Sequence, residues 1–296
     1  MRNTAHAGVK VTLAVAALGA SLLAPIGTAE ARPTNEHSTV AQVRAFGFDY
    51  AKAEAAHANA PTGVKTVGKP QAVRTTLAAA PASYSLKQYT LPAGDQGQVG
   101  SCVAWATGYT AMGLLAKEQG KTGYPFAPMF VYAQIAKGND TGTWASVALP
   151  IEKNQGIDTK AHYWQGDFDY TTQPDDSERA NALQYRITGY TDLTNAADRK
   201  TAIQNAISSG LPVPIGFKVR TSFRYLDSTN YTYNPAKREK VIGGHEVTIV
   251  GYDEYGVEIE NSWGADWGNQ GFFRAPWSFI TGRDVDEVHS VGKIIS

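Results

Sequence analysis

The stretch GSCVAWATGYTAMGLLAKEQG, residues 100–120, decides how the rest of the chain is interpreted. Ser101 suits an N-cap and Gly120 suits a helix end, because their backbone and side-chain preferences match those positions. Between these two ends no charged residue precedes Lys117. A helix that is apolar all round is buried on most of its sides. We therefore predict a buried helix over 102–117, opened by the only cysteine of the chain.

That cysteine, Cys102, is placed for nucleophilic chemistry. Free backbone N–H groups and the positive end of the helix dipole favour an anion in a first turn, so we expect a lowered pKa for its thiol. A single cysteine can form no intramolecular disulfide, and it excludes metal sites built on several thiolates. Isolated cysteines are most often inert and buried, so a functional interpretation requires a base nearby.

His245 is the strongest candidate for that base. It follows Gly243 and Gly244, where the backbone can approach a ligand closely, and it opens an apolar strand. Asn261 ends the next strand along the chain and could orient the imidazole. The other histidines lack such a setting: His6, His37, His57, His162 and His289.

For His245 and Asn261 to share one face of a hairpin, its loop must have an odd number of residues. A three-residue loop with Gly256 in the left-handed conformation satisfies this condition. Glu246 alternates to the opposite face of its strand, where we expect a solvated charge.

The remaining patterns predict an α+β fold with helices and sheet segregated. We expect a helical lobe over about 96–195 and a β lobe over about 196–296. Further helices are predicted over 129–137, 144–154 and 196–209, and strands over 212–219, 245–252, 257–260 and 271–274.

The N-terminal part is typical of an exported protein. Arg2 and Lys10 precede an apolar stretch over 11–23, and Ala29 and Ala31 are the small residues that a signal peptidase reads. We predict a signal peptide over 1–31 and a secreted, extracellular product. The apolar stretch is too short to span a bilayer, and we expect no stable membrane insertion.

Residues 32–82 are rich in Ala, Thr, Pro and Val, which predicts a poorly ordered propeptide or linker with one possible helix around 48–58. The folded unit is then 83–296. Its composition indicates a globular protein, with 10 % aromatic and 18 % charged residues. Because 27 basic residues balance 27 acidic ones, nothing predicts a nucleic-acid partner.

Three motif blocks resemble those of papain-like cysteine peptidases. They are QGQVGSCVAWA from residue 96, GGHEV from 243 and NSWGADWGNQGF from 261. His245 follows Cys102 by 143 residues, and this distance, like the cysteine signature itself, is a known property of that family. Two positions depart from its usual pattern: Val99 stands where a disulfide cysteine is common, and Val103 where a tryptophan is common.

The resemblance implies a papain-like two-lobed fold and a peptidase that forms a thioester acyl-enzyme. Cys102 would be the nucleophile, His245 the general base and acid, and Asn261 the residue that orients the imidazole. Gln96 would complete the oxyanion hole, and Trp263 would shield the histidine–asparagine bond from water. The residues implied to contact a peptide substrate are Gly142, Trp144, Gly243 and Gly244.

Two other functions stay open at this point. A cell-wall peptide amidase or transpeptidase would use the same chemistry, and a non-catalytic binding protein could retain the scaffold. We expect a monomer that acts on peptides or proteins, with no cofactor and no metal. The common long inhibitory helix pattern of the family's prosegments is missing from 32–82, so the role of that segment is open.

Overall fold

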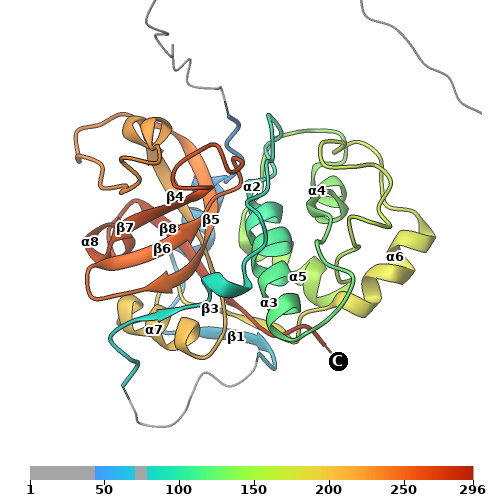
Figure 1. Cartoon of the computed structure of the whole chain (residues 1–296), viewed down its shortest axis with the longest axis horizontal. Helices are drawn as coiled ribbons and strands as arrows, with labels where there is room; N and C mark the ends of the chain where they lie inside the picture. The colour runs from blue at the N-terminus through green and yellow to red at the C-terminus, as the bar shows by residue number, and fades with distance from the viewer. Residues whose placement is uncertain (1–43, 71–78, 296) are drawn as a thin grey trace, which may run out of the picture. The chain divides into compact units, whose positions relative to one another are not determined.

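A computed structural model describes residues 44–70 and 79–295, which belong to one compact unit. The signal-peptide prediction therefore lies outside the described residues, as do 32–43 and 71–78 of the predicted propeptide. Within this described part, helices α2 to α6 lie beside the strands β4 to β8, and the cysteine helix faces β5 (Figure 1).

The helix predicted over 102–117 is present as three consecutive pieces. They are α2 (Cys102–Ala104), the π-helical segment η2 (Trp105–Met112) and α3 (Gly113–Glu118). Every residue from 102 to 116 is buried, as its apolar composition predicts. Ser101 precedes the helix but its side chain makes no capping hydrogen bond.

The other predicted helices are also present, with small differences in their bounds. They are α4 (Pro128–Ala136), α5 (Ala145–Asn154) and α7 (Arg199–Ser208). The prediction missed two short helices, α6 (Asp176–Ala182) and α8 (Trp277–Ile280), and three short 3-10 segments. Those segments are η1 (Lys87–Tyr89), η3 (Leu183–Tyr185) and η4 (Thr221–Tyr225).

One antiparallel sheet runs through the described residues in the order β1-β3-β8-β4-β5-β6-β7, and the short β2 (Tyr84–Ser85) pairs with β5. Its predicted strands are β4 (Val213–Arg220), β5 (Val241–Tyr252), β6 (Gly256–Glu260) and β7 (Phe272–Pro276). Besides the short β2, the prediction for 83–296 missed β3 (Gly189–Asp192) and β8 (Val285–Val291). They pair with each other and so join the sheet to the chain segment predicted as helical lobe.

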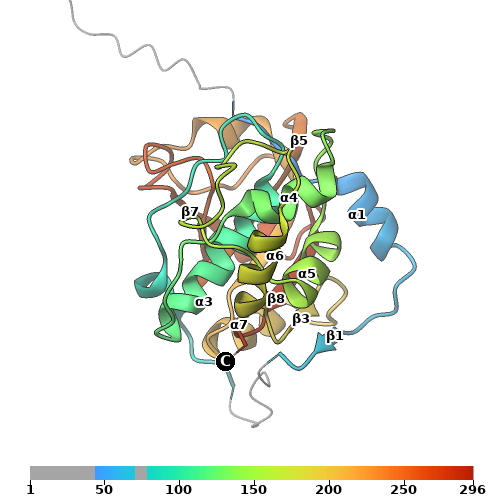
Figure 2. The same cartoon turned by 90° about the vertical axis from the view of Figure 1, so that its right-hand side faces the viewer.

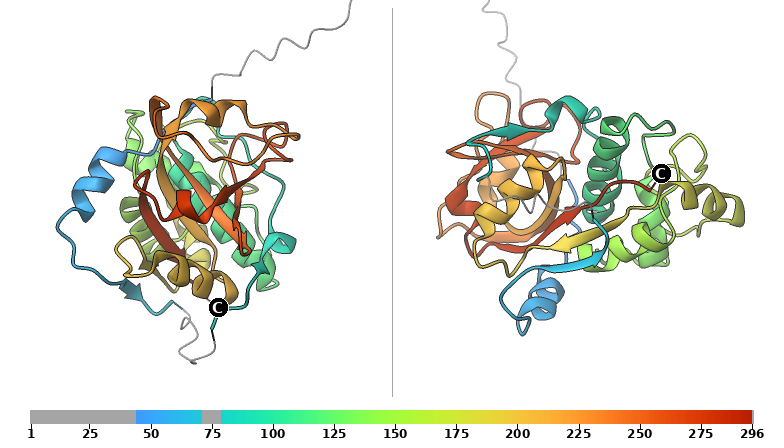
Figure 3. Two further views of the ribbon diagram at one scale, coloured as in Figure 1. Left: turned by 90° about the vertical axis from the view of Figure 1, so that its left-hand side faces the viewer. Right: turned by 90° about the horizontal axis from the view of Figure 1, so that it is seen from below.

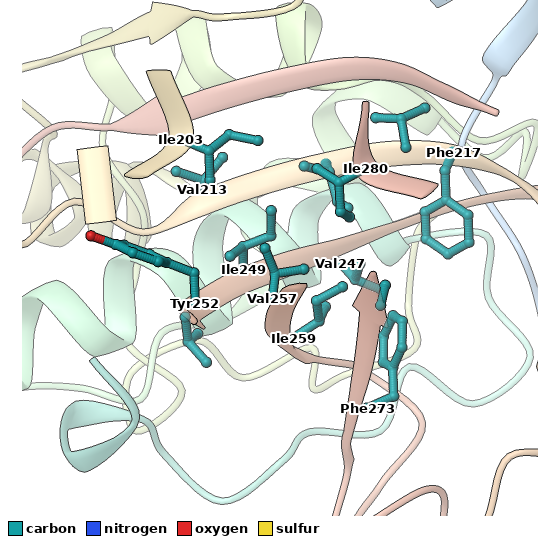
Figure 4. Packing of buried hydrophobic residues seen from close by; sticks show 14 of the residues in the cluster. Ile203, Val213, Phe217, Val247, Ile249, Tyr252, Val257, Ile259, Phe273 and Ile280 are labelled. Carbon is teal, nitrogen blue, oxygen red and sulfur yellow. The ribbon is translucent and has the colours of Figure 1, made fainter. Parts of the chain in front are cut away.

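The β lobe has its own apolar core, which fixes β4, β5 and β6 together (Figure 4). Ile203 of α7 belongs to this cluster, and α7 contacts β4 and β5. A second cluster surrounds the cysteine helix, α4 and α5. The active-site candidates therefore lie where two separately packed cores meet.

The hairpin of β5 and β6 has the predicted three-residue loop, residues 253–255. Gly256, however, begins β6 and does not adopt the left-handed conformation. A Cβ atom there would lie 2.1 Å from the carbonyl oxygen of Ala275, so the close approach of β7 explains the glycine. The carboxylate of Asp253 accepts the N–H groups of Tyr255 and Gly256 and closes the loop.

The prediction that 32–82 is poorly ordered is wrong for residues 44–70. This part carries α1 (Tyr50–His57) and β1 (Lys65–Gly68), which lie on the outer side of the strands β3 and β8 (Figure 3). β1 adds to the sheet by pairing with β3, and Phe48 and Ala53 are buried. Burial of apolar side chains and completion of a sheet edge are what composition alone could not reveal.

Candidate active site

Asn261 and the strand pairing hold His245 in one orientation. The Nε2 atom of His245 lies 2.7 Å from Oδ1 of Asn261, which also accepts the backbone N–H of Ser262. Because an amide oxygen only accepts, Nε2 carries the proton and Nδ1 keeps its lone pair. Nδ1 makes no hydrogen bond in the described part of the chain. The imidazole is thus a neutral base with an available nitrogen.

Cys102 faces the same strand from the other lobe. The backbone N–H of Glu246, the residue after His245, favours the thiolate and so acts to lower the pKa of Cys102. Helix α2 and strand β5 are in direct contact here. The nucleophile and base candidates, which the sequence separates widely, are therefore brought together at the junction of the two cores.

Burial keeps both groups neutral, and this overturns the expected low pKa of the thiol. Burial and the nearby Glu246 carboxyl raise the pKa of Cys102 far above its usual value, although backbone N–H groups partly oppose them. For His245, burial lowers the pKa to about 4 despite the Asn261 bond. Desolvation outweighs the helix dipole because it penalises the charged form of each group.

Aromatic rings enclose His245. The ring of Trp263 lies 4.9 Å from the imidazole between centroids, Phe223 lies 5.8 Å away and Phe46 lies 5.9 Å away. Trp263 is almost fully buried. It is therefore in the position to keep water from the His245–Asn261 bond.

Gln96 is buried and held by three contacts. The Ser262 hydroxyl donates to its Oε1 atom at 2.7 Å, so the amide nitrogen points the other way. Nε2 donates to the carbonyl oxygen of Val99 at 3.0 Å and, in a longer contact of 3.4 Å, to that of Ala45. This N–H is thus aimed at a carbonyl of the upstream segment.

Residues 45–49, here named the cleft segment, lie on the residues expected to contact substrate. Gly244 accepts the N–H groups of Gly47 and Phe48 at 3.2 and 3.1 Å. Thr143 exchanges two backbone hydrogen bonds with Gly47 and Asp49, at 2.8 and 2.9 Å. The cleft segment therefore pairs with both lobes in the manner of a bound peptide.

The predicted glycines match this close approach. A Cβ atom at Gly142 would lie 2.3 Å from the Gly47 carbonyl oxygen, and one at Gly244 would lie 2.2 Å from that of Phe48. At Gly243 it would lie 2.5 Å from the Phe46 ring. Larger residues would collide with the segment at all three positions.

Trp144, the fourth predicted contact, immediately precedes α5 and is partly buried. The Nζ atom of Lys52 in α1 lies 5.7 Å from the centre of its ring. Trp144 thus faces the helix that follows the cleft segment rather than the segment itself.

The loop that carries Gly142 is fixed by an exposed acid, Asp140. The carboxylate of Asp140 accepts the Gly100 N–H at 3.0 Å and the Tyr132 hydroxyl at 2.5 Å, and that hydroxyl accepts the Gly142 N–H at 3.0 Å. This network couples the turn before Cys102 to the loop.

Phe48 of the cleft segment fills a pocket that sequence reasoning missed. The floor of this pocket is Gly216 in β4, where a Cβ atom would lie 2.3 Å from the Phe48 ring. Gly216 pairs with Glu246 on one side and Glu287 on the other. A glycine within an apolar strand was the available signal, because it often marks a close approach.

The expectation that Glu246 is a solvated charge is wrong. Its side chain is 1 % exposed, because the face opposite His245 packs between the lobes rather than against water. Burial, together with Glu287 and Glu152, raises the pKa of Glu246 well above its usual value. Neither carboxyl oxygen has a hydrogen-bond partner among the described residues. A neutral acid therefore stands beside Cys102.

Comparisons with known proteins place these observations in a family. A family model described as papain family cysteine protease matches residues 80–279. An uncharacterized peptidase C1-like protein of Acanthamoeba polyphaga mimivirus is 27 % identical over 64 % of this chain and 66 % of its own length. Mouse cathepsin K is 27 % identical over 64 % of this chain and 57 % of its own length. The chain thus matches roughly three fifths of each relative.

Solved structures show the same fold. Xylellain, a cysteine protease from Xylella fastidiosa, superimposes with a TM-score of 0.65 at 24 % identity, covering 76 % of this chain and 90 % of the other. Digestive procathepsin L 3 of Tenebrio molitor gives a TM-score of 0.58 at 20 % identity, over 81 % of this chain and 79 % of that one. The predicted papain-like α+β fold is confirmed.

Alkylation of the full-length chain tests the protonation state of Cys102. Because only the thiolate reacts and burial raises the thiol pKa, we expect iodoacetamide labelling near pH 7 to be slower than in the urea-unfolded chain. The rate should still rise above pH 9. Mass spectrometry of the intact protein detects one unambiguous adduct, since Cys102 is the only cysteine.

A matched variant separates burial from other causes. Phe46→Ala together with Phe48→Ala removes the two side chains that hold the cleft segment, and labelling should accelerate at least tenfold at pH 7. Rapid, pH-independent labelling of the unaltered chain between pH 5 and 7 would contradict the assigned neutral thiol.

Proposed function

Because the chain belongs to the papain family of cysteine proteases, we propose that it is a secreted cysteine peptidase made as an inactive precursor. Cys102 is the nucleophile, His245 the general base and acid, Asn261 the residue that orients the imidazole, and Gln96 an oxyanion donor. The observation that carries the proposal is the 2.7 Å bond from His245 to Asn261, which leaves Nδ1 available at the Cys102 helix.

The reaction follows from these positions. His245 Nδ1 takes the thiol proton and Cys102 Sγ attacks the peptide carbonyl carbon, while the carbonyl oxygen gains negative charge. His245 then gives the proton to the leaving amine, the C–N bond breaks and a thioester remains. A water molecule attacks the thioester, His245 takes its proton, and the sulfur leaves as thiolate. Asn261 holds the ring through both transfers.

Gln96 is positioned to stabilise the charge on the carbonyl oxygen. Its Nε2 atom already points at a carbonyl of the cleft segment, and Ser262 prevents the amide from turning over. Each such donor contributes about 3 kcal/mol to transition-state stabilisation when it lies about 2.7–3.1 Å from the oxyanion.

The cleft segment is proposed to keep the precursor inactive. It uses the backbone groups of Thr143 and Gly244 that a peptide substrate would need, and its Phe46 ring covers His245. The burial that it contributes keeps thiol and imidazole neutral. Removal of the segment rehydrates both groups and lets the proton move from Cys102 to His245.

The pocket of Phe48 is proposed to select one substrate side chain. Its floor is a glycine and its occupant is an aromatic ring, so a large apolar side chain fits there once the segment has left.

Substitutions at the site test the mechanism. In the processed enzyme, Cys102→Ala and His245→Ala should abolish hydrolysis of a peptide amide, whereas Asn261→Ala should lower kcat by about 10- to 100-fold, because the imidazole loses its orientation but keeps its basicity. Tyr255→Ala, in an exposed loop, is the control and should leave kcat unchanged. Near-normal turnover by Cys102→Ala would exclude the proposed nucleophile.

Filling the pocket tests the specificity. In the processed enzyme, Gly216→Val should lower kcat/KM for a substrate with phenylalanine at the matching position by at least tenfold, because the new side chain occupies the ring's place. A substrate with alanine there should lose much less. Equal losses for both substrates would show that Gly216 acts on folding rather than on selection.

Secretion is proposed from the N-terminal pattern alone. Within the part of the chain that the structure describes, no helix has the length and hydropathy needed to cross a bilayer. Expression of the full chain in a bacterium with a Sec pathway should release protein that starts at Arg32. Mass spectrometry of the intact cytoplasmic and external fractions measures this, and retention of residues 1–31 in all fractions would contradict it.

A further inference from the structure

Three side chains from distant parts of the sequence converge beside α1, away from Cys102. They are His57 at the end of α1, Asp192 at the end of β3 and His289 in β8. His57 Nε2 lies 3.1 Å from Asp192 Oδ2, and His289 Nε2 lies 3.9 Å from Asp192 Oδ1. One atom from each residue can be chosen so that all lie within 4.8 Å of one another. The carboxylate thus stands between two imidazoles.

The ring of His57 is oriented by the helix that carries it. Its Nδ1 atom lies 2.8 Å from the carbonyl oxygen of Ala53, one turn earlier. Nδ1 therefore donates, and Nε2 is directed at Asp192. Metal-binding histidines usually donate their second ring nitrogen to a carbonyl or carboxylate in this way.

His289 is buried, with only 1 % of its side chain exposed. Its Nδ1 atom has no hydrogen-bond partner among the described residues. Its Nδ1 atom lies 3.7 Å from Glu287 Oε1, which places a second carboxylate behind the ring. The Nε2 atom instead faces Asp192 Oδ1 at 3.9 Å, beyond hydrogen-bonding distance, so a ligand shared with that carboxylate fits between them.

We propose that His57, Asp192 and His289 bind one Zn²⁺ ion, through the two Nε2 atoms and a carboxylate oxygen, with water as the fourth ligand. Two imidazoles and one carboxylate are a ligand set that zinc prefers, whereas Ca²⁺ and Mg²⁺ prefer oxygen ligands. Zinc–ligand bonds of about 2.0–2.2 Å place neighbouring ligands about 3.3 Å apart. The 3.1 Å between His57 Nε2 and Asp192 Oδ2 already matches, and His289 Nε2, 3.9 Å from Asp192 Oδ1, must move closer.

The ion would tie the cleft segment to the sheet. His57 is the last residue of α1, the helix that directly follows residues 45–49. Asp192 and His289 belong to the paired strands β3 and β8. Figure 2 shows α1 on the outer side of the molecule, where few other elements hold it. The site itself stands without the proposed peptidase activity, and only its effect on precursor stability rests on that function.

Mass action gives the size of that effect. An ion that binds only when α1 is in place lowers the equilibrium constant for detachment by a factor of 1 + [Zn²⁺]/Kd, which is about 100-fold at 100 times Kd.

Zinc binding to the full-length Cys102→Ala chain tests the site. This background removes the only thiol, which could itself bind zinc, and it prevents self-cleavage. The chain is prepared without an affinity tag and treated with a chelator. Isothermal titration with ZnCl₂ and metal analysis after dialysis should then find one ion per chain with micromolar or tighter affinity, undisturbed by 1 mM Ca²⁺ or Mg²⁺.

Single variants identify the ligands. His57→Gln and His289→Gln should each weaken binding at least tenfold. His162→Gln is the matched control, because His162 Nδ1 also lies 2.8 Å from a carboxylate, that of Asp158, and belongs to no such group of three. Its affinity should be unchanged. Should His289→Gln fail to fold, His57→Gln on the outer helix still decides the question.

Limited proteolysis of the same chain measures whether bound zinc holds α1 on the sheet. Bound zinc should slow cleavage between α1 and β1 at least tenfold, and His57→Gln should cancel this protection. Absence of binding at 100 µM Zn²⁺, or full affinity in His57→Gln, would overturn the proposal and leave His57 and Asp192 as an ion pair only. Because these readouts need no catalysis, their failure is distinguishable from failure of the proposed peptidase.

Discussion

The packing of one buried helix against one strand is the constraint on which the site depends. The helix over 102–118 has no charged face, so it can only exist between the two cores. The hydroxyl of Thr248 in β5 donates to the carbonyl oxygen of Ala106 at 2.8 Å and ties helix to strand in the dry interface. π-helical turns such as η2 often occur at functional sites, where backbone groups are freed from the regular pattern. Cys102 and His245 meet because this contact fixes their elements.

The burial that brings Cys102 and His245 together also lowers their reactivity, because it disfavours the charged form of each group. A thiolate and an imidazolium need water or compensating charge, and the closed site offers an apolar ring, Phe46, and a neutral acid, Glu246. Reactivity is therefore proposed to depend on one removable element, the cleft segment. This segment is bound through backbone hydrogen bonds with Gly244 and Thr143 and through packing of Phe48 on Gly216. An ion pair between the neighbouring Arg44 and Asp95 adds to these contacts. Each contact is modest, but all are lost together when the segment leaves.

Much of the fold could be predicted because its decisive elements have local signals. The apolar helix after Ser101, and the strands around His245 and Asn261, follow from periodicity and glycine placement. β3 and β8 were missed because their pairing joins residues about a hundred positions apart, and no local pattern encodes such a partner. Within residues 44–70 the helix α1 was expected around 48–58, but β1 and the burial of Phe48 were missed, since they come from contacts with the peptidase domain.

Within the site, residue identity was more predictable than environment. The geometry of His245, Asn261 and Trp263 agrees with the motif blocks, whereas the state of Cys102 and of Glu246 does not follow from them. A helix dipole can be inferred from sequence, but desolvation depends on what lies against the helix start, and here Gly47 of a distant segment lies against Gly100. Phe48 and Gly216 show the same limit, because a pocket floor and its occupant are unrelated in sequence.

The cleft segment is proposed to keep the thiol of Cys102 and the imidazole of His245 neutral. The most direct measurement is the ¹⁵N NMR titration of the His245 imidazole, assigned with His245→Gln, in the full-length chain and in the chain cleaved between α1 and β2. In the full-length chain we expect a neutral ring that titrates near pH 4, with Nε2 protonated. After cleavage we expect an imidazolium at pH 7. An imidazolium at pH 7 in the full-length chain would contradict this proposal.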